Sequence, residues 1–105
     1  MIYFVSRHNS SIQWSRLQKL AIDEWLPHLD PEIINTGDIV IGSLPINMVA
    51  ELIKRGARYI HLTLQVPLEL RGRELSLEEL SACGATLEEY SACLIDSFDP
   101  ARHPI

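Results

Sequence analysis

A polar stretch near the start of the chain contains residue types that could bind and cleave a phosphodiester. It follows the apolar run 2–5 and consists of Ser6, Arg7, His8, Asn9, Ser10 and Ser11. An arginine fork and the backbone amides of a helix start can hold a phosphate, and a histidine transfers protons near neutral pH. We therefore treat Arg7 and His8 as candidate catalytic residues and Ser6 and Ser11 as candidate ligand contacts. The alternative is that the stretch only caps the following helix and leaves His8 in solvent.

A second candidate is the turn Gly42–Leu44, between an apolar strand predicted at 39–41 and an amphipathic helix predicted at 45–55. A strand, a glycine turn and a helix together direct backbone N–H groups and a positive dipole end toward an anion. The turn lacks the lysine and further glycines of a P-loop or a GxGxxG motif. An ordinary turn between strand and helix is the alternative. As ligand contacts, the sequence offers Gly42, Ser43 and Leu44.

Arg71 and Arg73 flank a glycine in the predicted loop 65–75 and form the densest basic cluster in the second half of the chain. Both guanidiniums are candidates for contact with a ligand at this end of the sheet; a solvated loop is the alternative. His61 shares a strand face with Tyr59 and Thr63, which favours a structural role. The sequence has no His, Asp and Glu cluster with the spacing of metal ligands, so phosphodiester cleavage would depend on positioning and cationic stabilisation.

The elements that must position these residues are predicted in the order β-α-β-β-α-β-α-β. The predicted strands span 2–5, 24–29, 39–41, 58–64 and 86–94, and the predicted helices span 12–22, 45–55 and a short segment from the capping box at Ser76 to Gly84. Pro27 removes a backbone donor from the second strand, which predicts an edge position.

The helix predicted at 45–55 carries a single apolar stripe, expected to be buried, that consists of Ile46, Val49, Leu52 and Ile53. Alternating strands and helices predict an α/β fold with a mostly parallel sheet and helices on both faces. Ligands of such sheets bind outside the carboxyl ends of the strands. The loops 6–11, 42–45 and 65–73 leave those ends, so the candidate residues are expected to face one pocket.

Composition limits the possible partners. The chain has 105 residues, of which 47% are hydrophobic and 22% charged, as in a soluble single domain. We expect one domain over 1–94 and a tail over 95–105. The net charge of −5 argues against broad binding to DNA or RNA. Residues 1–73 contain eight Lys or Arg and seven Asp or Glu, whereas residues 74–105 contain one and seven, so the acidic excess is C-terminal.

The two cysteines, Cys83 and Cys93, have neither the spacing of a zinc site nor that of a disulfide framework. Reduced thiols are the simple interpretation. The sequence contains no apolar run long enough for a membrane span and no signal-peptide pattern at its N-terminus. We therefore expect a cytoplasmic protein that does not associate with membranes.

Several blocks, in order, resemble a small family of Csx-type CRISPR-associated proteins found with type III systems. They are YFVSRH at 3–8, HLDP at 28–31, GDIVIGSLP at 37–45, RGARYIHL at 55–62 and ELRGRELS at 69–76. The resemblance covers about residues 1–92. It implies a Rossmann-like fold related to the CARF domains that sense cyclic oligoadenylates.

The resemblance also implies a ring nuclease, a homodimer that binds and linearises cyclic tetra-adenylate without a metal ion or other cofactor. A ribose 2′-hydroxyl would attack the adjacent phosphodiester and leave a 2′,3′-cyclic phosphate. By position, Arg7 and His8 would bind phosphate and transfer protons, Ser43 and Leu44 would contribute turn contacts, and Arg71 would stabilise developing charge. Asn47, at the start of the helix predicted at 45–55, is a further candidate for ligand contact. A non-catalytic module that sequesters the messenger, and an interaction subunit with no nucleotide ligand, remain alternatives.

Overall fold

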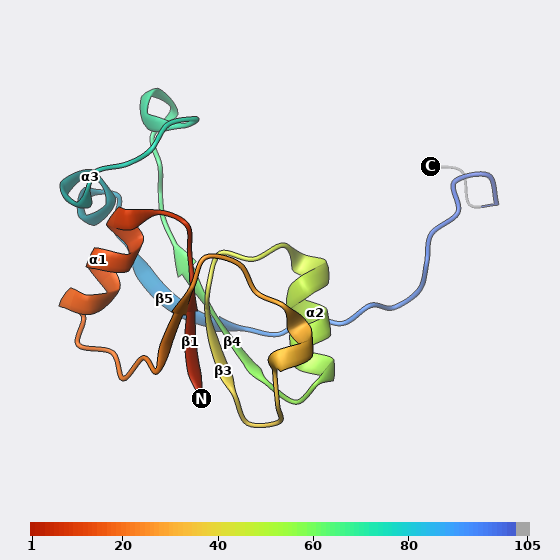
Figure 1. The fold of residues 1–105 in the computed structure, drawn as a ribbon. Coiled ribbons are helices and arrows are strands. Elements are labelled where there is room, and N and C mark those ends of the chain that lie inside the picture. Colours follow the sequence, from red (N-terminus) through yellow and green to blue (C-terminus); the bar gives the residue numbers. More distant parts are fainter. Residues whose placement is uncertain (103–105) are drawn as a thin grey trace.

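The computed structural model describes residues 1–102 and contains a five-stranded sheet with the strand order β2-β1-β3-β4-β5 (Figure 1). The strands are β1 (Ile2–Val5), β2 (Glu24–Leu26), β3 (Ile39–Gly42), β4 (Arg58–Thr63) and β5 (Thr86–Tyr90). The helices are α1 (Asn9–Leu17), α2 (Ile46–Lys54) and α3 (Leu77–Ala82), with short 3-10 turns η1 (Pro31–Ile33) and η2 (Leu68–Leu70). The order of strands and α-helices is the predicted one.

The pairing confirms a mostly parallel, Rossmann-like α/β sheet. The strand pairs β1–β2, β1–β3 and β3–β4 are parallel, and only β5 at the far edge runs antiparallel, against β4. The strand β2 lies at the opposite edge, as Pro27 predicted, although the strand ends at Leu26, directly before the proline.

Helices cover both faces of the sheet, as predicted (Figure 1). On one face α2 packs over Val40, Tyr59 and neighbouring apolar residues through Val49 and Leu52. On the other face, Trp14 of α1 and Leu80 of α3 pack over a second cluster that includes Phe4 of β1. The alternating side chains of each central strand therefore point into two separate cores.

The predicted limits of the first helix were wrong. The helix begins at Asn9 rather than Ile12, because Ser10 and Ser11 are small enough to be buried in its first turn. It ends at Leu17, and Lys19 then adopts a left-handed backbone conformation with φ of 55°. This reversal of the chain lets Leu20 and Ile22 pack against the second cluster, under α1 and α3, instead of extending the helix.

Two other predictions need correction. Ile46 was expected in the buried stripe of α2, but it is the first residue of the helix and its side chain is 77% exposed. The last strand ends at Tyr90 rather than at residue 94. From there the chain passes alongside α2 and then leaves the body (Figure 1). Residues 103–105 of the predicted tail lie outside the described residues.

Among the described residues, no helix is long and apolar enough to cross a membrane.

Asp38 carries the clearest pH-dependent contribution to stability. Its buried carboxylate accepts hydrogen bonds from the Asn35 amide at 2.8 Å and the Met1 amino group at 3.1 Å. The Asn35 bond holds the pKa of this carboxyl below its usual value, although burial acts in the opposite direction. A carboxyl whose folded-state pKa is lowered stabilises the fold fully above its unfolded-state pKa of about 4. That stabilisation is lost as the pH falls through the folded-state pKa.

We expect Asp38→Asn to reduce the free energy of unfolding by about 1–3 kcal/mol at pH 7, since the substitution weakens or breaks two hydrogen bonds to a charged acceptor. Urea unfolding at pH 7 and pH 3 measures the effect, which should be smaller at pH 3. Glu69→Gln is a suitable control, because the Glu69 side chain has no hydrogen bond or ion pair to any residue in 1–102. An equal loss at both pH values would contradict the prediction.

Candidate functional site

A cleft of about 600 Å³ opens at the carboxyl ends of the parallel strands. In the order β2-β1-β3-β4, the chain moves to one side of β1 and then returns to the other, so the topology switches between β1 and β3. Open α/β sheets bind ligands at such switch points, because the two loops there diverge onto opposite faces. Here those loops are Ser6–His8 and Ser43–Pro45, and both line the cleft.

Most of the residues predicted to form the site line this cleft together. They are Ser6, Arg7, His8, Ser11, Gly42, Ser43 and Leu44. The helices α1 and α2 both begin at the same edge, and first-turn amides have no acceptor within a helix. The cleft therefore combines side-chain cations with helix N-termini, an arrangement suited to an anion.

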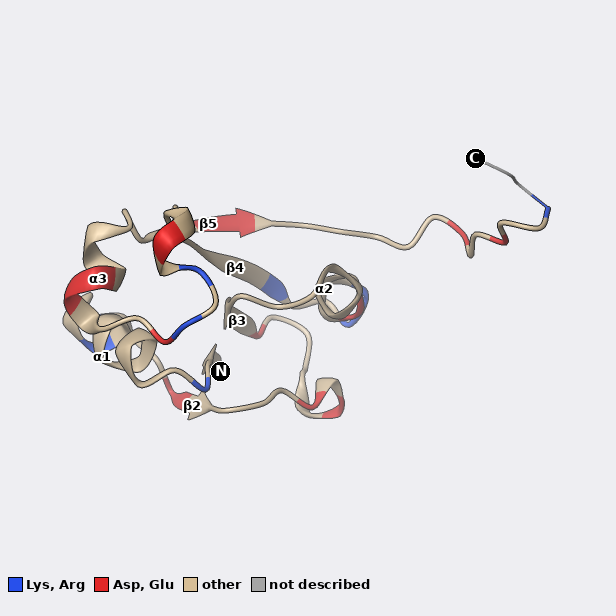
Figure 2. Cartoon of the chain, turned by 90° about the horizontal axis from the view of Figure 1, so that it is seen from above, with Lys and Arg blue, Asp and Glu red and all other residues tan. Residues whose placement is uncertain are grey.

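The lining is basic although the chain is acidic. Among the described residues, its ionisable side chains are Arg7, His8 and His28, and no Asp or Glu lines it. Arg7 is exposed and has no hydrogen bond or ion pair to any residue in 1–102. Figure 2 looks onto this edge: basic segments of the β1–α1 turn and of the 65–75 loop lie between the helices, with acidic segments in the same loop and farther out on η1, α3 and β5. A bound anion would meet an unpaired guanidinium.

His8 is held from two directions. Its backbone amide donates to the Ser6 hydroxyl at 3.1 Å, and its ring Nδ1 lies 2.7 Å from a carboxylate oxygen of Glu74. Both side chains of this ion pair remain more than half exposed. Glu74 belongs to the 65–75 loop, so the pair ties that loop to the start of α1.

Tyr59 and His61 of β4 brace the glycine turn from the α2 side. The Tyr59 hydroxyl donates to the Gly42 carbonyl at 3.0 Å and accepts from the Leu44 amide at 2.9 Å. It also lies 2.6 Å from Nδ1 of His61. Since the hydroxyl has one proton, donation to Gly42 makes the protonated Nδ1 of His61 the donor to tyrosine. His61 is therefore structural, as predicted, and burial raises the pKa of Tyr59 so that its hydroxyl stays protonated.

We expect Tyr59→Phe to reduce the free energy of unfolding by about 1–3 kcal/mol, because it leaves the Leu44 amide and Gly42 carbonyl without their partner. Urea unfolding measures the loss. Tyr90→Phe is the matched control, since the Tyr90 hydroxyl has no hydrogen bond within residues 1–102 and its ring still meets His61. Equal stability of both variants would contradict the bracing role.

Some polar groups of the turn 42–44, which was expected to hold a ligand, already form hydrogen bonds within the protein. The Ser43 hydroxyl donates to the Leu62 carbonyl at 3.0 Å, and the Leu44 amide donates to Tyr59. Ser43 keeps free lone pairs but its proton is engaged. The turn thus shapes the cleft through its backbone position, which Tyr59 fixes.

The structure places Arg71 and Arg73 outside the cleft, in a neighbouring hollow of about 430 Å³ within the long loop. Nε of Arg71 donates to the Val66 carbonyl at 3.0 Å, and Arg73 forms an ion pair with Glu79 of α3. The Ser76 amide and then Arg73 lower the pKa of Glu79. Both guanidiniums therefore point toward partners in the loop and in α3 rather than into the cleft. Leu64 lines both this hollow and the cleft, so the two cavities adjoin.

Asn47 also lies away from the cleft. One helical step separates it from Met48, which lines the cleft, and Asn47 instead lines a hollow with residues 92–94. Because successive helical residues point about 100° apart, only one of these neighbours can face the cleft.

His28 lines the cleft, although the sequence patterns did not indicate it as a site residue. It follows β2, the edge strand, whose carboxyl end lies at the same edge as those of β1 and β3. Three loops were expected at this edge, and the parallel pairing of β2 with β1 adds a fourth. A histidine directly after a strand and a proline was the signal that could have pointed to it.

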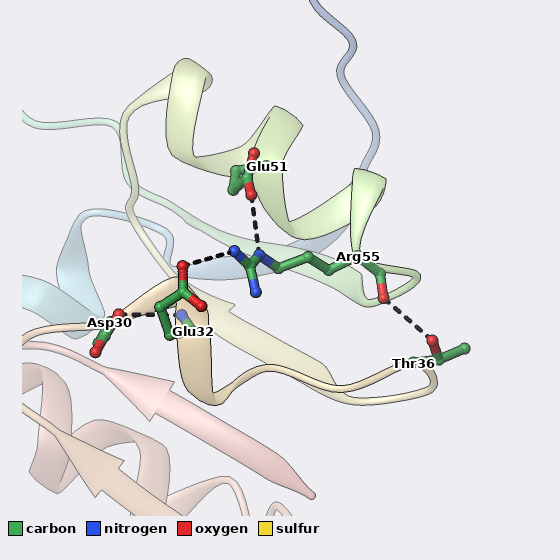
Figure 3. A network of polar contacts seen from close by, with 5 residues as sticks. All are labelled: Asp30, Glu32, Thr36, Glu51 and Arg55. Carbon is green, nitrogen blue, oxygen red and sulfur yellow. Dashed lines mark hydrogen bonds and ion pairs between the residues drawn. The ribbon is translucent and has the colours of Figure 1, made fainter.

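The segment after His28 is fastened to the C-terminal end of α2 by a polar network (Figure 3). Nε of Arg55 donates to Glu51 at 2.9 Å, and its terminal nitrogen bonds Glu32 of η1 at 3.1 Å. These carboxylates raise the pKa of Arg55. The Asp30 carboxylate caps η1 by accepting from the Glu32 amide at 3.0 Å. The connection that carries His28 is thereby anchored to α2 at Glu32, four residues downstream.

Within residues 1–102, no group of three or more His, Cys, Asp or Glu side chains is placed to hold a metal ion.

Comparison with known proteins gives one assignment. No curated protein and no solved structure matches the chain significantly. A protein-family model, described as "Putative CRISPR-associated protein (Cas_VVA1548)", matches residues 3–93. That range contains every strand and α-helix from Tyr3 onward and the whole lining of the cleft. The chain therefore belongs to this family of CRISPR-associated proteins.

Proposed function

We propose that the protein is a ring nuclease that binds and linearises cyclic tetra-adenylate, the second messenger of type III CRISPR antiviral signalling. The observation that supports this proposal is the basic lining of the switch-point cleft on a chain of net charge −5. A cyclic oligoadenylate presents phosphodiesters, which an arginine fork and helix N-termini bind well. Membership of a CRISPR-associated family supports the biological setting.

In the proposed reaction, a ribose 2′-hydroxyl attacks the adjacent phosphorus and displaces the 5′-oxygen, leaving a 2′,3′-cyclic phosphate. Arg7 binds the phosphate and stabilises its developing charge, and His8 transfers a proton. Arg71 and Arg73, in the adjoining hollow, would contact a neighbouring phosphate of the same ring. No metal ion is required by this scheme.

A homodimer would suit this ligand. A volume of about 600 Å³ lies within the range of roughly 300–1,000 Å³ typical of small-molecule sites. A ring of four nucleotides exceeds such a site, so one cleft would hold part of it. Two copies related by a two-fold axis would surround a two-fold symmetric ligand and double each basic loop. A homodimer is also what the resemblance to CARF-related ring nucleases implies.

The decisive experiment is to incubate the protein with an excess of labelled cyclic tetra-adenylate, with and without EDTA, and to separate the products by chromatography. We expect many equivalents of linear product ending in a 2′,3′-cyclic phosphate, in both conditions. An intact ring after long incubation would overturn the proposal.

The same assay separates the alternatives. Binding of one ring per dimer without linear product would indicate a sequestering module. If cyclic oligoadenylates also failed to raise the melting temperature, an interaction subunit without a nucleotide ligand would be favoured. Cyclic tri- and hexa-adenylate as substrates would measure the preference for ring size.

A further inference from the structure

We propose that His28 and His8 act as an acid–base pair in ring cleavage, with Glu74 as the residue that positions His8. His8 accepts the proton of the attacking 2′-hydroxyl, and His28 donates a proton to the leaving 5′-oxygen. This inference rests on the function proposed above and adds to it two residues with stated roles, His28 and Glu74.

The pairing of β1 with β2 brings His28 to the site. Val5 and Leu26 are partners in the parallel register, and the Ser6 amide continues the ladder by donating to the Leu26 carbonyl at 2.9 Å. Two residues beyond this register, the chains reach Arg7 on one side and His28 on the other. Both side chains line the cleft. His28 thus stands beside the residue expected to hold the phosphate.

His28 is both accessible and anchored. Its side chain is exposed and has no hydrogen bond or ion pair to any residue in 1–102. The next residue, Leu29, is buried in the core on the α2 side, and Asp30 caps η1. The backbone that follows His28 is therefore fixed, while the imidazole itself is exposed to the cleft.

Glu74 sets the protonation pattern of His8. An ionised carboxylate only accepts hydrogen bonds, so the Nδ1 that lies 2.7 Å from Glu74 must carry the proton. In the neutral ring, Nε2 then has the free lone pair and can accept a proton. The neighbouring carboxylate also stabilises the imidazolium that forms when it does. His8 is therefore better suited to act as the base.

The surroundings of His28 differ in charge from those of His8. Arg7 shares its part of the cleft, and the carboxylate of Glu74 pairs with His8 instead. Within the described residues, β3, α2 and β4 contribute no ionisable side chain to the cleft lining. Since Glu74 assigns His8 to the base, His28 is the other imidazole on the cleft lining and is the one that can donate a proton to the leaving oxygen.

The proposed step is balanced. The 2′-oxygen forms a bond to phosphorus as its proton moves to Nε2 of His8. The bond between phosphorus and the 5′-oxygen breaks, and the electron pair of that bond takes the proton of His28. The products are a 2′,3′-cyclic phosphate and a 5′-hydroxyl, and no water, oxidant or metal is consumed. Exchange with solvent through the exposed rings restores both histidines.

The test compares His28→Ala and His28→Asn with the wild-type protein on cyclic tetra-adenylate, and on the same ring with one bridging 5′-oxygen replaced by sulfur. We expect turnover of the oxygen ring to fall by about 100-fold or more, as for loss of a general acid, with little change in affinity. A thiolate leaves without protonation, so the sulfur-containing linkage should be cleaved by the His28 variants at close to the wild-type rate. His8→Ala, which lacks the base, should not be rescued.

The pH profile gives a second readout. The wild-type rate should rise and then fall with pH, because His8 must be neutral and His28 protonated. His28→Ala should lose the falling limb. Glu74→Gln should reduce turnover less than His8→Ala and shift the rising limb, while Glu78→Gln, whose side chain has no partner within residues 1–102, should change neither.

The outcomes distinguish this inference from the proposed function. If wild-type protein leaves the ring intact, both are overturned. If wild-type protein cleaves the ring and folded His28→Ala does so at the same rate with the same pH profile, the acid–base pair is overturned and the ring nuclease stands. Failure of the sulfur substrate to rescue His28→Ala would remove the role of general acid.

Discussion

Replacing Arg7 with alanine is expected to lower the rate of ring cleavage by about 100- to 1,000-fold, the range found when one donor to a developing negative charge is removed. Arg7 is the arginine on the cleft lining, and its guanidinium has no other partner within residues 1–102. No internal ion pair is broken by the change, so the melting temperature should stay the same. The effect should appear in turnover more strongly than in affinity.

Arg7→Lys would test the chemistry further. Lysine keeps the charge but lacks the planar fork that binds two phosphate oxygens at once, so an intermediate rate is expected. Arg102→Ala is the matched control, because Arg102 is exposed, follows the last strand in the chain and has no side-chain partner among the described residues. Wild-type turnover by folded Arg7→Ala would refute the assignment of this residue.

Gly42→Ala is expected to reduce the free energy of unfolding by about 1–3 kcal/mol, as for overpacking in a close-packed interior. A Cβ at this position would stand 2.8 Å from the Val5 carbonyl oxygen, a backbone atom of the neighbouring strand. Since φ of Gly42 is not left-handed, the requirement for glycine is spatial. For a domain of this size, the loss corresponds to a fall in melting temperature of roughly 4–8 °C per kcal/mol.

The same substitution should also impair the site. Relief of the contact must move β1 and β3 apart at their carboxyl ends, where Ser6–His8 and Ser43–Leu44 line the cleft. Turnover per folded molecule should therefore fall together with stability. Gly84→Ala is the comparison, because its φ of 67° disfavours alanine but a Cβ there meets nothing within 4 Å. It should lower stability without changing turnover, and an equal fall in turnover for both variants would contradict the argument.

The two central strands were predictable from short stretches of sequence. The runs 2–5 and 39–41 are continuously apolar, and in the structure Phe4 and Val40 have no exposed surface at all. A strand that is covered on both faces is mostly apolar along its whole length, so a continuous apolar run predicts this burial. The order of strands and helices follows from the same local signals, and it predicts parallel pairing.

Much of the cleft followed from that order. In a parallel sheet the carboxyl ends share an edge, so the loops after 2–5 and 39–41 had to lie close together. The order of elements therefore places Ser6, Arg7 and His8 at the same edge as Gly42–Leu44, and the pairing of β1 with β3 makes the two loops neighbours. The start of α1 was harder to predict from the sequence, because the burial of Ser10 and Ser11 depends on which segments pack against this helix.

The tertiary structure decided which side chains reach the cleft. Arg71 and Arg73 turn toward partners in their own loop and α3, while Asn47 lines a different hollow from Met48. The place of β2 beside β1 brings His28 to the cleft, and the residues around His28 do not specify which strand β2 pairs with. Such outcomes depend on competing packing and ion-pairing choices between segments distant in the chain.

The sequence by itself determined a parallel α/β sheet and a polar edge with Arg7, His8 and the glycine turn, because local hydrophobic patterns encode strands, helices and burial. Only the folded chain joined His8 to Glu74, 66 residues away, and set His28 into the same cleft. Local sequence patterns do not predict contacts between residues so far apart in the chain. Those contacts form when the strands take their places in the sheet, and they supply the proposed acid–base chemistry of the site.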